Sequence, residues 1–75
     1  MCLSKLRWQC RRGMRELDVL LLRHLENDYP QGSEEEKAAF RELLGLSDPE
    51  LRAYLLAGEQ TGQPATDKIL RQMRH

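Results

Sequence analysis

Residues 33–55 read SEEEKAAFRELLGLSDPELRAYL and contain two helix starts of the same kind. Ser33 precedes Glu36 by three positions, and Ser47 precedes Glu50 by the same spacing. In this capping-box pattern the serine and glutamate side chains each bond the backbone N–H of the other residue, which opens a helix. Leucine and aromatic residues then recur at the spacing of one helical face after each box. We therefore predict two consecutive helices that turn their apolar sides toward a core.

The preceding segment, residues 15–28, predicts a longer amphipathic helix. Its apolar stripe follows the i, i+3, i+4 spacing that meets a core and consists of Leu17, Leu20, Leu21 and Leu25. His24 falls inside this stripe. Because no partner Cys, His or carboxylate pattern accompanies it, we expect a packing residue. The opposite side of the helix carries Arg15, Glu16, Val19, Arg23 and Glu26. Glu16 therefore stays available to a partner.

Two further helices complete the expected fold. Residues 4–12 predict a short first helix, with Ser4 as its N-cap and Gly13 as its C-terminal stop. A last helix is expected to start at Gln63 or Thr66, after a polar loop that contains two glycines. No segment alternates apolar and polar residues in the manner of a strand. The predicted fold class is all-α, a small bundle of four to five short helices.

The length and composition favour a single domain, residues 1–75, that acts through its surface. At 75 residues one core gives only modest stability, so we expect no large internal active-site cavity. No serine, cysteine or carboxylate pair stands at a spacing that organises catalysis, which predicts that the protein is not an enzyme. No apolar run approaches the ~18 residues of a membrane-spanning helix. We expect a monomeric, cytoplasmic protein without membrane insertion.

The cysteine and histidine residues do not form a metal-binding pattern. Cys2 and Cys10 lie eight positions apart without a Cys-x-x-Cys motif, and His24 and His75 are far from both. Because no zinc spacing is present, no metal site is predicted. Two cysteines also do not indicate the disulfide framework of a secreted protein, so Cys10 is expected to be an ordinary semi-buried thiol.

Charge is distributed unevenly along the chain, although the net charge is zero. Residues 1–24 carry six Lys or Arg against two acidic residues, and residues 25–59 carry three against nine. Residues 60–75 carry three against one. We therefore expect a basic N-terminal region and an acidic middle.

The segment WQCRRGMRELD, residues 8–18, is hard to explain as part of a core. Glycine costs a helix interior about 1 kcal/mol relative to alanine, so Gly13 indicates a left-handed backbone or the close approach of another chain. The three arginines around it keep their charge, and burial without a partner would be strongly unfavourable. Two interpretations remain open for Trp8: a core residue buried between the first two helices, or a partly exposed contact residue. The segment as a whole predicts a presented surface.

The run Arg12-Gly13-Met14-Arg15-Glu16, preceded by Trp8 and followed by Leu17-Asp18, resembles the signature of the FAD assembly factor (SdhE) family. These proteins are also called succinate dehydrogenase assembly factor 2. The resemblance continues through Tyr29, the acidic segment 33–37, Phe40 and Asp48-Pro49, so it covers nearly the whole chain. Tyr54 stands where an aromatic residue, often tryptophan, is usual in this family.

The resemblance implies an assembly factor, or chaperone, that binds the flavoprotein subunit of succinate dehydrogenase. The related subunit of fumarate reductase is a second candidate client. The factor would promote covalent attachment of FAD to a histidine of the client without supplying the nucleophile. FAD would belong to the client, and no tight FAD site is expected in this protein, because the sequence has neither a Walker loop nor a dinucleotide fingerprint.

Carried over by residue, the resemblance assigns the functional core of the signature to Arg12, Gly13 and Glu16. The neighbours expected to shape the same partner-binding surface are Trp8, Arg11, Met14, Arg15 and Asp18. Gly13 would allow close backbone approach, while Arg12 and Glu16 would supply charge-assisted contacts. The alternative is that Arg12 and Glu16 simply pair with each other across one helical turn.

A second class of function rests on the basic N-terminal region. A basic patch interleaved with Trp8 and Gln9 consists of Lys5, Arg7, Arg11, Arg12 and Arg15. Such a patch is typical of small nucleic-acid-binding proteins, and an antitoxin-type regulatory role, a name sometimes attached to this family, belongs to the same class. The zero net charge and the acidic middle weaken long-range attraction to phosphate, so this reading ranks below partner binding.

Overall fold

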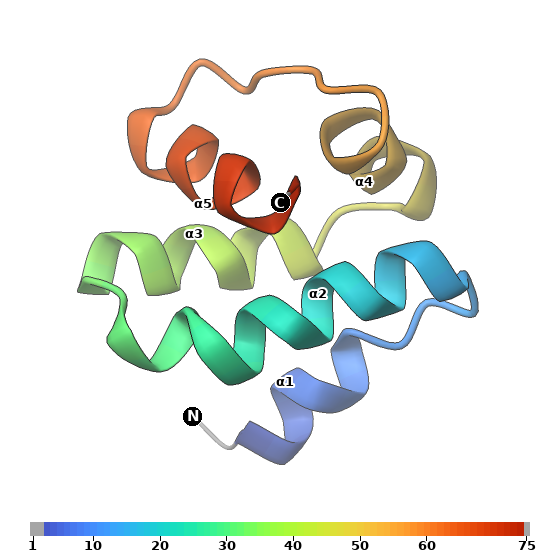
Figure 1. Ribbon diagram of the computed structural model, residues 1–75, viewed down its shortest axis with the longest axis horizontal. Coiled ribbons are helices and arrows are strands. Elements are labelled where there is room, and N and C mark those ends of the chain that lie inside the picture. The colour runs from blue at the N-terminus through green and yellow to red at the C-terminus, as the bar shows by residue number, and fades with distance from the viewer. Residues whose placement is uncertain (1–2, 75) are drawn as a thin grey trace.

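The computed structural model describes residues 3–74, and over this range the chain forms five α-helices and no strand (Figure 1). The helices are α1 (Leu3–Gln9), α2 (Arg15–Asn27), α3 (Glu34–Leu44), α4 (Asp48–Leu55) and α5 (Pro64–Arg74). A short 3-10 helix, η1 (Tyr29–Gln31), joins α2 to α3. The all-α prediction with four to five short helices is confirmed.

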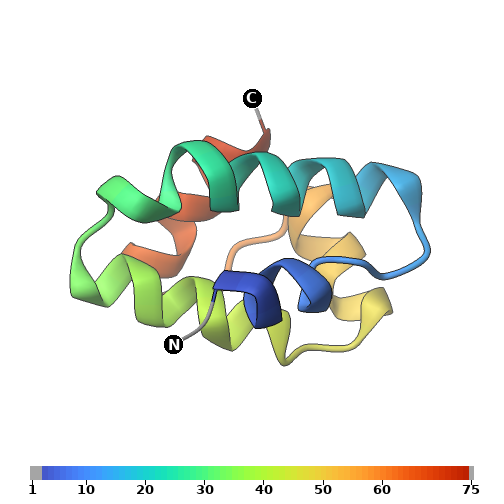
Figure 2. The ribbon, with the colours of Figure 1, turned by 90° about the horizontal axis from the view of Figure 1, so that it is seen from below.

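The helix α5 lies at the centre of the packing, since it contacts α2, α3 and α4 (Figure 1). The helix α1 packs against α2, and the view of Figure 2 shows it in front of the space between α2 and α3. The radius of gyration is 11.0 Å, as expected for a well-packed chain of this length. Within residues 3–74, no helix combines the length and the apolar character needed to span a bilayer.

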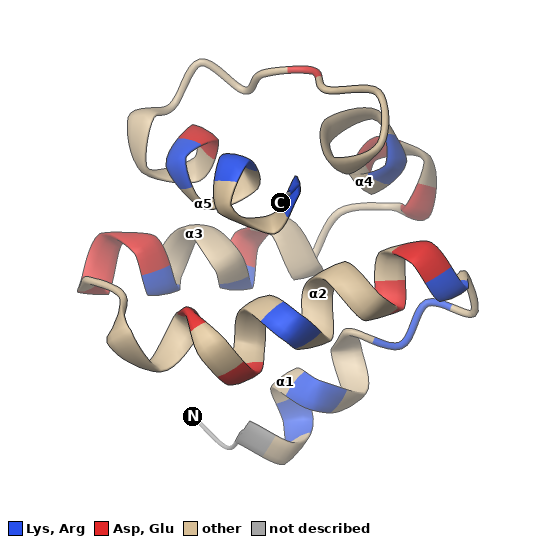
Figure 3. Ribbon diagram, in the orientation of Figure 1, with Lys and Arg blue, Asp and Glu red and all other residues tan. Residues whose placement is uncertain are grey.

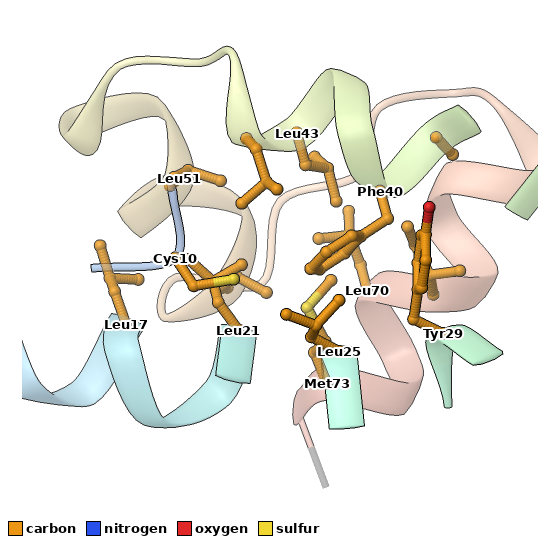
Figure 4. Packing of buried hydrophobic residues seen from close by; sticks show 14 of the residues in the cluster. Cys10, Leu17, Leu21, Leu25, Tyr29, Phe40, Leu43, Leu51, Leu70 and Met73 are labelled. Atoms are coloured by element: carbon orange, nitrogen blue, oxygen red, sulfur yellow. The ribbon is translucent and has the colours of Figure 1, made fainter. Parts of the chain in front are cut away.

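Buried side chains from all five helices and the segments joining them form one apolar cluster (Figure 4). The predicted stripe of α2 is confirmed, with Leu17, Leu21 and Leu25 buried and Leu20 partly buried. Phe40 of α3 is fully buried, and its ring centroid lies 4.9 Å from that of His24. His24 is thus a packing residue, as the sequence predicts.

Both predicted capping boxes are present and fix the starts of α3 and α4. Ser33 Oγ accepts from the backbone N–H of Glu36 (3.2 Å), and the Ser33 N–H donates to Glu36 Oε1 (2.9 Å). The same pair of bonds joins Ser47 and Glu50, each at 3.4 Å. Because these bonds satisfy backbone groups that a helix start otherwise leaves open, the two boxes set the boundaries of α3 and α4.

The prediction for the first helix is wrong at both ends. The helix α1 begins at Leu3, so Ser4 lies inside it and is not the N-cap, and α1 ends at Gln9 rather than at residue 12. Cys10 follows the helix directly and is fully buried. Gly13 is therefore not a helix stop. It has a φ of +79°, which confirms the left-handed backbone expected of this glycine.

The last helix begins at Pro64, directly after Gln63, which agrees with the earlier of the two predicted starts. Proline is favoured in a first helical turn because its missing N–H would have no partner there. Thr66 lies in that first turn and is buried. The loop before α5 is held by Asp67, whose Oδ1 accepts from the backbone N–H of Thr61 (2.8 Å). This bond lowers the pKa of the Asp67 carboxyl.

Candidate functional site

The signature segment forms the loop between α1 and α2 and the first turn of α2, at the right-hand end of the molecule in Figure 1. Of the eight residues predicted to bind a partner, five are exposed: Trp8, Arg11, Gly13, Arg15 and Glu16. The other three are partly buried: Arg12, Met14 and Asp18. The segment therefore has an outward face and an inward face.

Among the side chains that the structure describes, Trp8 is the most exposed of the large apolar ones, at 76% of its full surface. Trp8 is therefore a surface residue and is not buried between α1 and α2, which was the other interpretation that the sequence left open. Trp8 lines a hollow of about 200 Å³ together with Gln9, Arg11, Arg12 and Leu44. Tryptophan and arginine occur together on many protein-binding surfaces, because both residue types are enriched among those that contribute most of the binding energy.

Gly13 lies at the exposed part of the loop, with its backbone open to solvent. Apart from its two neighbours in the chain, a Cβ atom built at this position would meet no described atom within 4 Å. The left-handed backbone is thus the reason that glycine is needed for the fold, and the open space leaves room for another chain to approach.

Arg15 and Glu16 open α2 and expose both of their side chains. Within residues 3–74, neither side chain has an ion-pair or hydrogen-bond partner. The alternative of an Arg12–Glu16 pair is likewise not formed among the described residues, because Arg12 bonds other groups. Two adjacent, opposite charges are therefore free to meet a partner.

An apolar groove of about 380 Å³ runs beside these two charges. It is lined by Arg15, Glu16, Val19, Leu20 and Leu56, with a lining that is almost entirely apolar. Val19 and Leu56 are 52% and 44% exposed. The sequence prediction did not include Val19, although a valine among the charged residues of the outer α2 face was a usable signal. Leu56 gave no such signal, because only the packing of α4 against α2 brings it there.

Arg12 and Asp18 point into the molecule. The Arg12 side chain is 17% exposed and donates through Nη1 to the backbone oxygen of Leu46 (3.1 Å) and through Nη2 to that of Leu44. Arg12 Nη1 also lies 3.6 Å from Asp48 Oδ1. The backbone N–H of Arg12 donates to Asp18 Oδ1 at 2.7 Å. The Arg12 backbone N–H and both Nη atoms are thus bonded within the chain, whereas Nε is buried without a hydrogen-bond partner among the described residues. Contact between Arg12 and a partner stays a prediction.

The one described cysteine and the one described histidine, Cys10 and His24, lie in the core. Cys10 is fully buried rather than semi-buried, and burial raises the pKa of its thiol to about 11, so it is un-ionised at neutral pH. His24 is also buried, and burial lowers the pKa of its imidazole. Among residues 3–74, no three His, Cys, Asp or Glu side chains come close enough together to hold a metal ion.

Comparison with known proteins places the signature in a family. A family model described as "Flavinator of succinate dehydrogenase" matches residues 4–75. The FAD assembly factor SdhE of Shewanella oneidensis is 40% identical over 74 residues, which cover 99% of this chain and 90% of that protein. The FAD assembly factor SdhE of Idiomarina loihiensis is 41% identical over 69 residues, covering 92% of this chain and 77% of that protein.

A third relative matches to a similar extent. The FAD assembly factor SdhE of Coxiella burnetii is 40% identical over 71 residues, which cover 95% of this chain and 87% of that protein. The family model and the relatives each span nearly the whole chain, including the signature loop and all five helices. This chain therefore belongs to the family of succinate dehydrogenase flavinators, whose named relatives are FAD assembly factors.

Proposed function

We propose that this protein binds the flavoprotein subunit of succinate dehydrogenase and promotes covalent attachment of FAD to that subunit. The observation that carries the proposal is the exposed face of the signature in a chain of this family. The exposed residues of the signature are Trp8, Gly13, Arg15 and Glu16, and the last two line the apolar groove that includes Val19. Apolar area beside unpaired charge is what a specific protein partner can bury and neutralise.

The contribution of this protein is to favour one arrangement of the client. Its own Cys10 and His24 are buried, so neither supplies a nucleophile at the surface. Binding to a client conformation in which the flavin and the client histidine are close raises the population of that conformation. Holding two reacting groups together in this way can accelerate a reaction without any catalytic group of the binding protein.

FAD, in this proposal, stays with the client throughout. The two hollows beside the signature measure about 200 and 380 Å³ and are open to solvent, whereas a tight small-molecule site encloses most of its ligand. The flavoprotein subunit of fumarate reductase is the second client that we propose, because it shares the covalent flavin chemistry. We place the encounter in the cytoplasm and expect the protein to act as a monomer.

The nucleic-acid alternative receives less support from the geometry. Arg7 of the basic patch pairs with Glu26 at 2.8 Å, and Arg12 is bonded to backbone oxygens. Only part of the predicted positive charge is then available to phosphate groups, and binding to nucleic acid depends on that number.

The decisive experiment compares two glutamates in equivalent helix positions. Glu16 is the second residue of α2 and Glu35 is the second residue of α3, and both are exposed. Glu16→Ala should lower covalent flavin in a co-expressed flavoprotein subunit by roughly tenfold, the effect of losing one charge-assisted hydrogen bond. Glu35→Ala should leave it unchanged, although it removes the same favourable charge from a helix N-terminus.

Covalent flavin is measured as fluorescence of the denatured client subunit, and circular dichroism confirms that each variant is folded. Full flavinylation with Glu16→Ala would show that the assigned surface is wrong. A client that gains no covalent flavin from the unmodified protein would overturn the proposed function itself.

A further inference from the structure

The loop between α1 and α2, residues 10–14, is anchored at both ends. Cys10 is fully buried, and Met14 packs against the core. Met14 also occupies the N-cap position of α2, where it makes no side-chain capping bond. The helix start therefore lacks the polar cap that usually fixes the entering chain, and the middle of the loop needs another support.

Asp18 supplies that support from one turn inside α2. Its Oδ1 accepts from the backbone N–H of Arg12 at 2.7 Å, the length of a charge-assisted hydrogen bond. The bond reaches back across Gly13 and holds the loop against the helix that follows it.

Arg12 holds the same loop from the other side, against the junction of α3 and α4. Leu44 is the last residue of α3 and Leu46 lies two positions further on, and their backbone oxygens accept from the Arg12 guanidinium. The last carbonyls of a helix lack partners within the helix and carry partial negative charge, so a guanidinium is well suited to them. Arg12 Nη1 also lies 3.6 Å from Asp48 Oδ1, at the start of α4. The Arg12 guanidinium is therefore held by groups of this chain.

We propose that Arg12 and Asp18 are positioning residues of the signature, which lock the α1–α2 loop and so present Gly13, Arg15 and Glu16 to the flavoprotein subunit. The inference rests on the proposed function and divides the signature into an internal pair and an external face. A loop without this lock populates several conformations. The apparent affinity for the client then falls with the fraction of molecules in the binding conformation.

Replacing the Asp18 carboxylate by an amide separates the two roles. The amide oxygen of Asp18→Asn still accepts the Arg12 N–H, whereas Asp18→Ala cannot. We expect Asp18→Ala to weaken binding of the purified flavoprotein subunit by about tenfold, and Asp18→Asn by less than about threefold. Glu16→Gln makes the same carboxylate-to-amide change two residues away on the external face. It should weaken binding by about tenfold, because the lost charge faces the client.

A double-mutant cycle tests the part played by Arg12. If Arg12 and Asp18 hold one loop, Arg12→Ala combined with Asp18→Ala should weaken binding no more than the stronger of the two single changes. Arg12→Ala combined with Glu16→Gln should instead show the product of the two single effects. Binding is measured by calorimetry at a temperature at which circular dichroism shows every variant folded.

A measurement on the isolated protein tests the role of Asp18 in holding the loop independently of client binding. Hydrogen exchange of the Arg12 amide, followed by NMR, should stay slow in Asp18→Asn and become fast in Asp18→Ala.

Equal loss of binding in Asp18→Asn and Asp18→Ala, or none in Asp18→Ala, would overturn the inference. Additive losses for Arg12→Ala and Asp18→Ala would overturn the part assigned to Arg12. An unmodified protein that does not bind the client would overturn the proposed function, while amide exchange still decides whether Asp18 holds the loop.

Discussion

At the scale of single residues, Gly13 has a matched control in Gly62. The φ angles are +79° and +85°, and an added Cβ would meet no atom within 4 Å at either position. Because an L residue in this backbone conformation costs roughly 1–2 kcal/mol, Gly13→Gln and Gly62→Gln should lower the free energy of unfolding by similar amounts. Only Gly13→Gln adds a side chain to the surface assigned to the client. It should reduce covalent flavin in the client beyond the loss of folded protein.

Thermal unfolding and client flavin fluorescence, recorded on the same two variants, give both quantities. If Gly13→Gln lost flavinylation only in proportion to its folded fraction, as Gly62→Gln is expected to do, the glycine would serve the backbone alone.

His24 predicts a specific dependence of stability on pH. Its side chain is 3% exposed, and burial lowers the pKa of the imidazole below 6.5, with Asp28 and Glu36 opposing the shift. The unfolded chain therefore takes up a proton near pH 6.5, before the folded chain does. Stability should fall as the pH drops below about 6.5 and level off below the folded pKa.

Two variants test whether His24 causes this fall in stability with decreasing pH. Denaturant unfolding between pH 7.5 and 5 should show no such fall for His24→Gln, which has no imidazole to protonate. Asp28→Asn should show a larger fall, because Asp28 Oδ2 lies 3.6 Å from His24 Nδ1 and raises the folded pKa. Parallel curves for the three proteins would contradict the assignment to His24.

At the scale of the helices, the capping boxes give a prediction that the sequence and the structure share. Ser33→Ala and Ser47→Ala should each lower the free energy of unfolding by about 1 kcal/mol. Each change removes the Oγ that accepts a backbone N–H, at 3.2 Å from Glu36 N in the first box and 3.4 Å from Glu50 N in the second.

Ser4 is the control for this pair, since it is exposed and lies inside α1 rather than at its N-cap. Alanine is the better helix former at such a position, so Ser4→Ala should leave the stability unchanged or slightly raised. Chemical denaturation of the three variants provides the comparison. A loss of stability in Ser4→Ala equal to that in Ser33→Ala would restore Ser4 as a cap.

At the scale of the whole molecule, the charge pattern follows the sequence prediction. Basic residues mark α1 and the loop after it, and acidic residues mark the start of α3 (Figure 3). The acidic run has a structural role, because Glu36 closes a capping box and also pairs with Lys68 at 3.2 Å. The exposed Arg7–Glu26 pair is worth no more than about 1 kcal/mol, so the signature end is held mainly by apolar packing and by the internal bonds of Arg12.

The sequence by itself determined the features that are local or periodic. The two serine boxes predict the starts of α3 and α4, and the leucine spacing predicts the buried side of α2, because a capping bond and a helical face each involve neighbouring residues. Gly13 signals a left-handed backbone for the same reason. The family also follows from the sequence, since the signature is an ordered set of residues.

Only the tertiary structure decided how Arg12 and Trp8 are placed, whereas the helical spacing already predicted Arg15 and Glu16 on the outer side of α2. Arg12 turns inward because its donors meet the oxygens of Leu44 and Leu46, which lie 32 and 34 positions further along the chain. Trp8 stays outside because Leu6 and Cys10, four positions apart, are the buried residues of this segment, and Trp8 lies about 200° away from each around the helix. The groove exists because α4 brings Leu56 to Val19 of α2. The exposure of a residue depends on segments distant in the sequence, and these come together only when the helices pack.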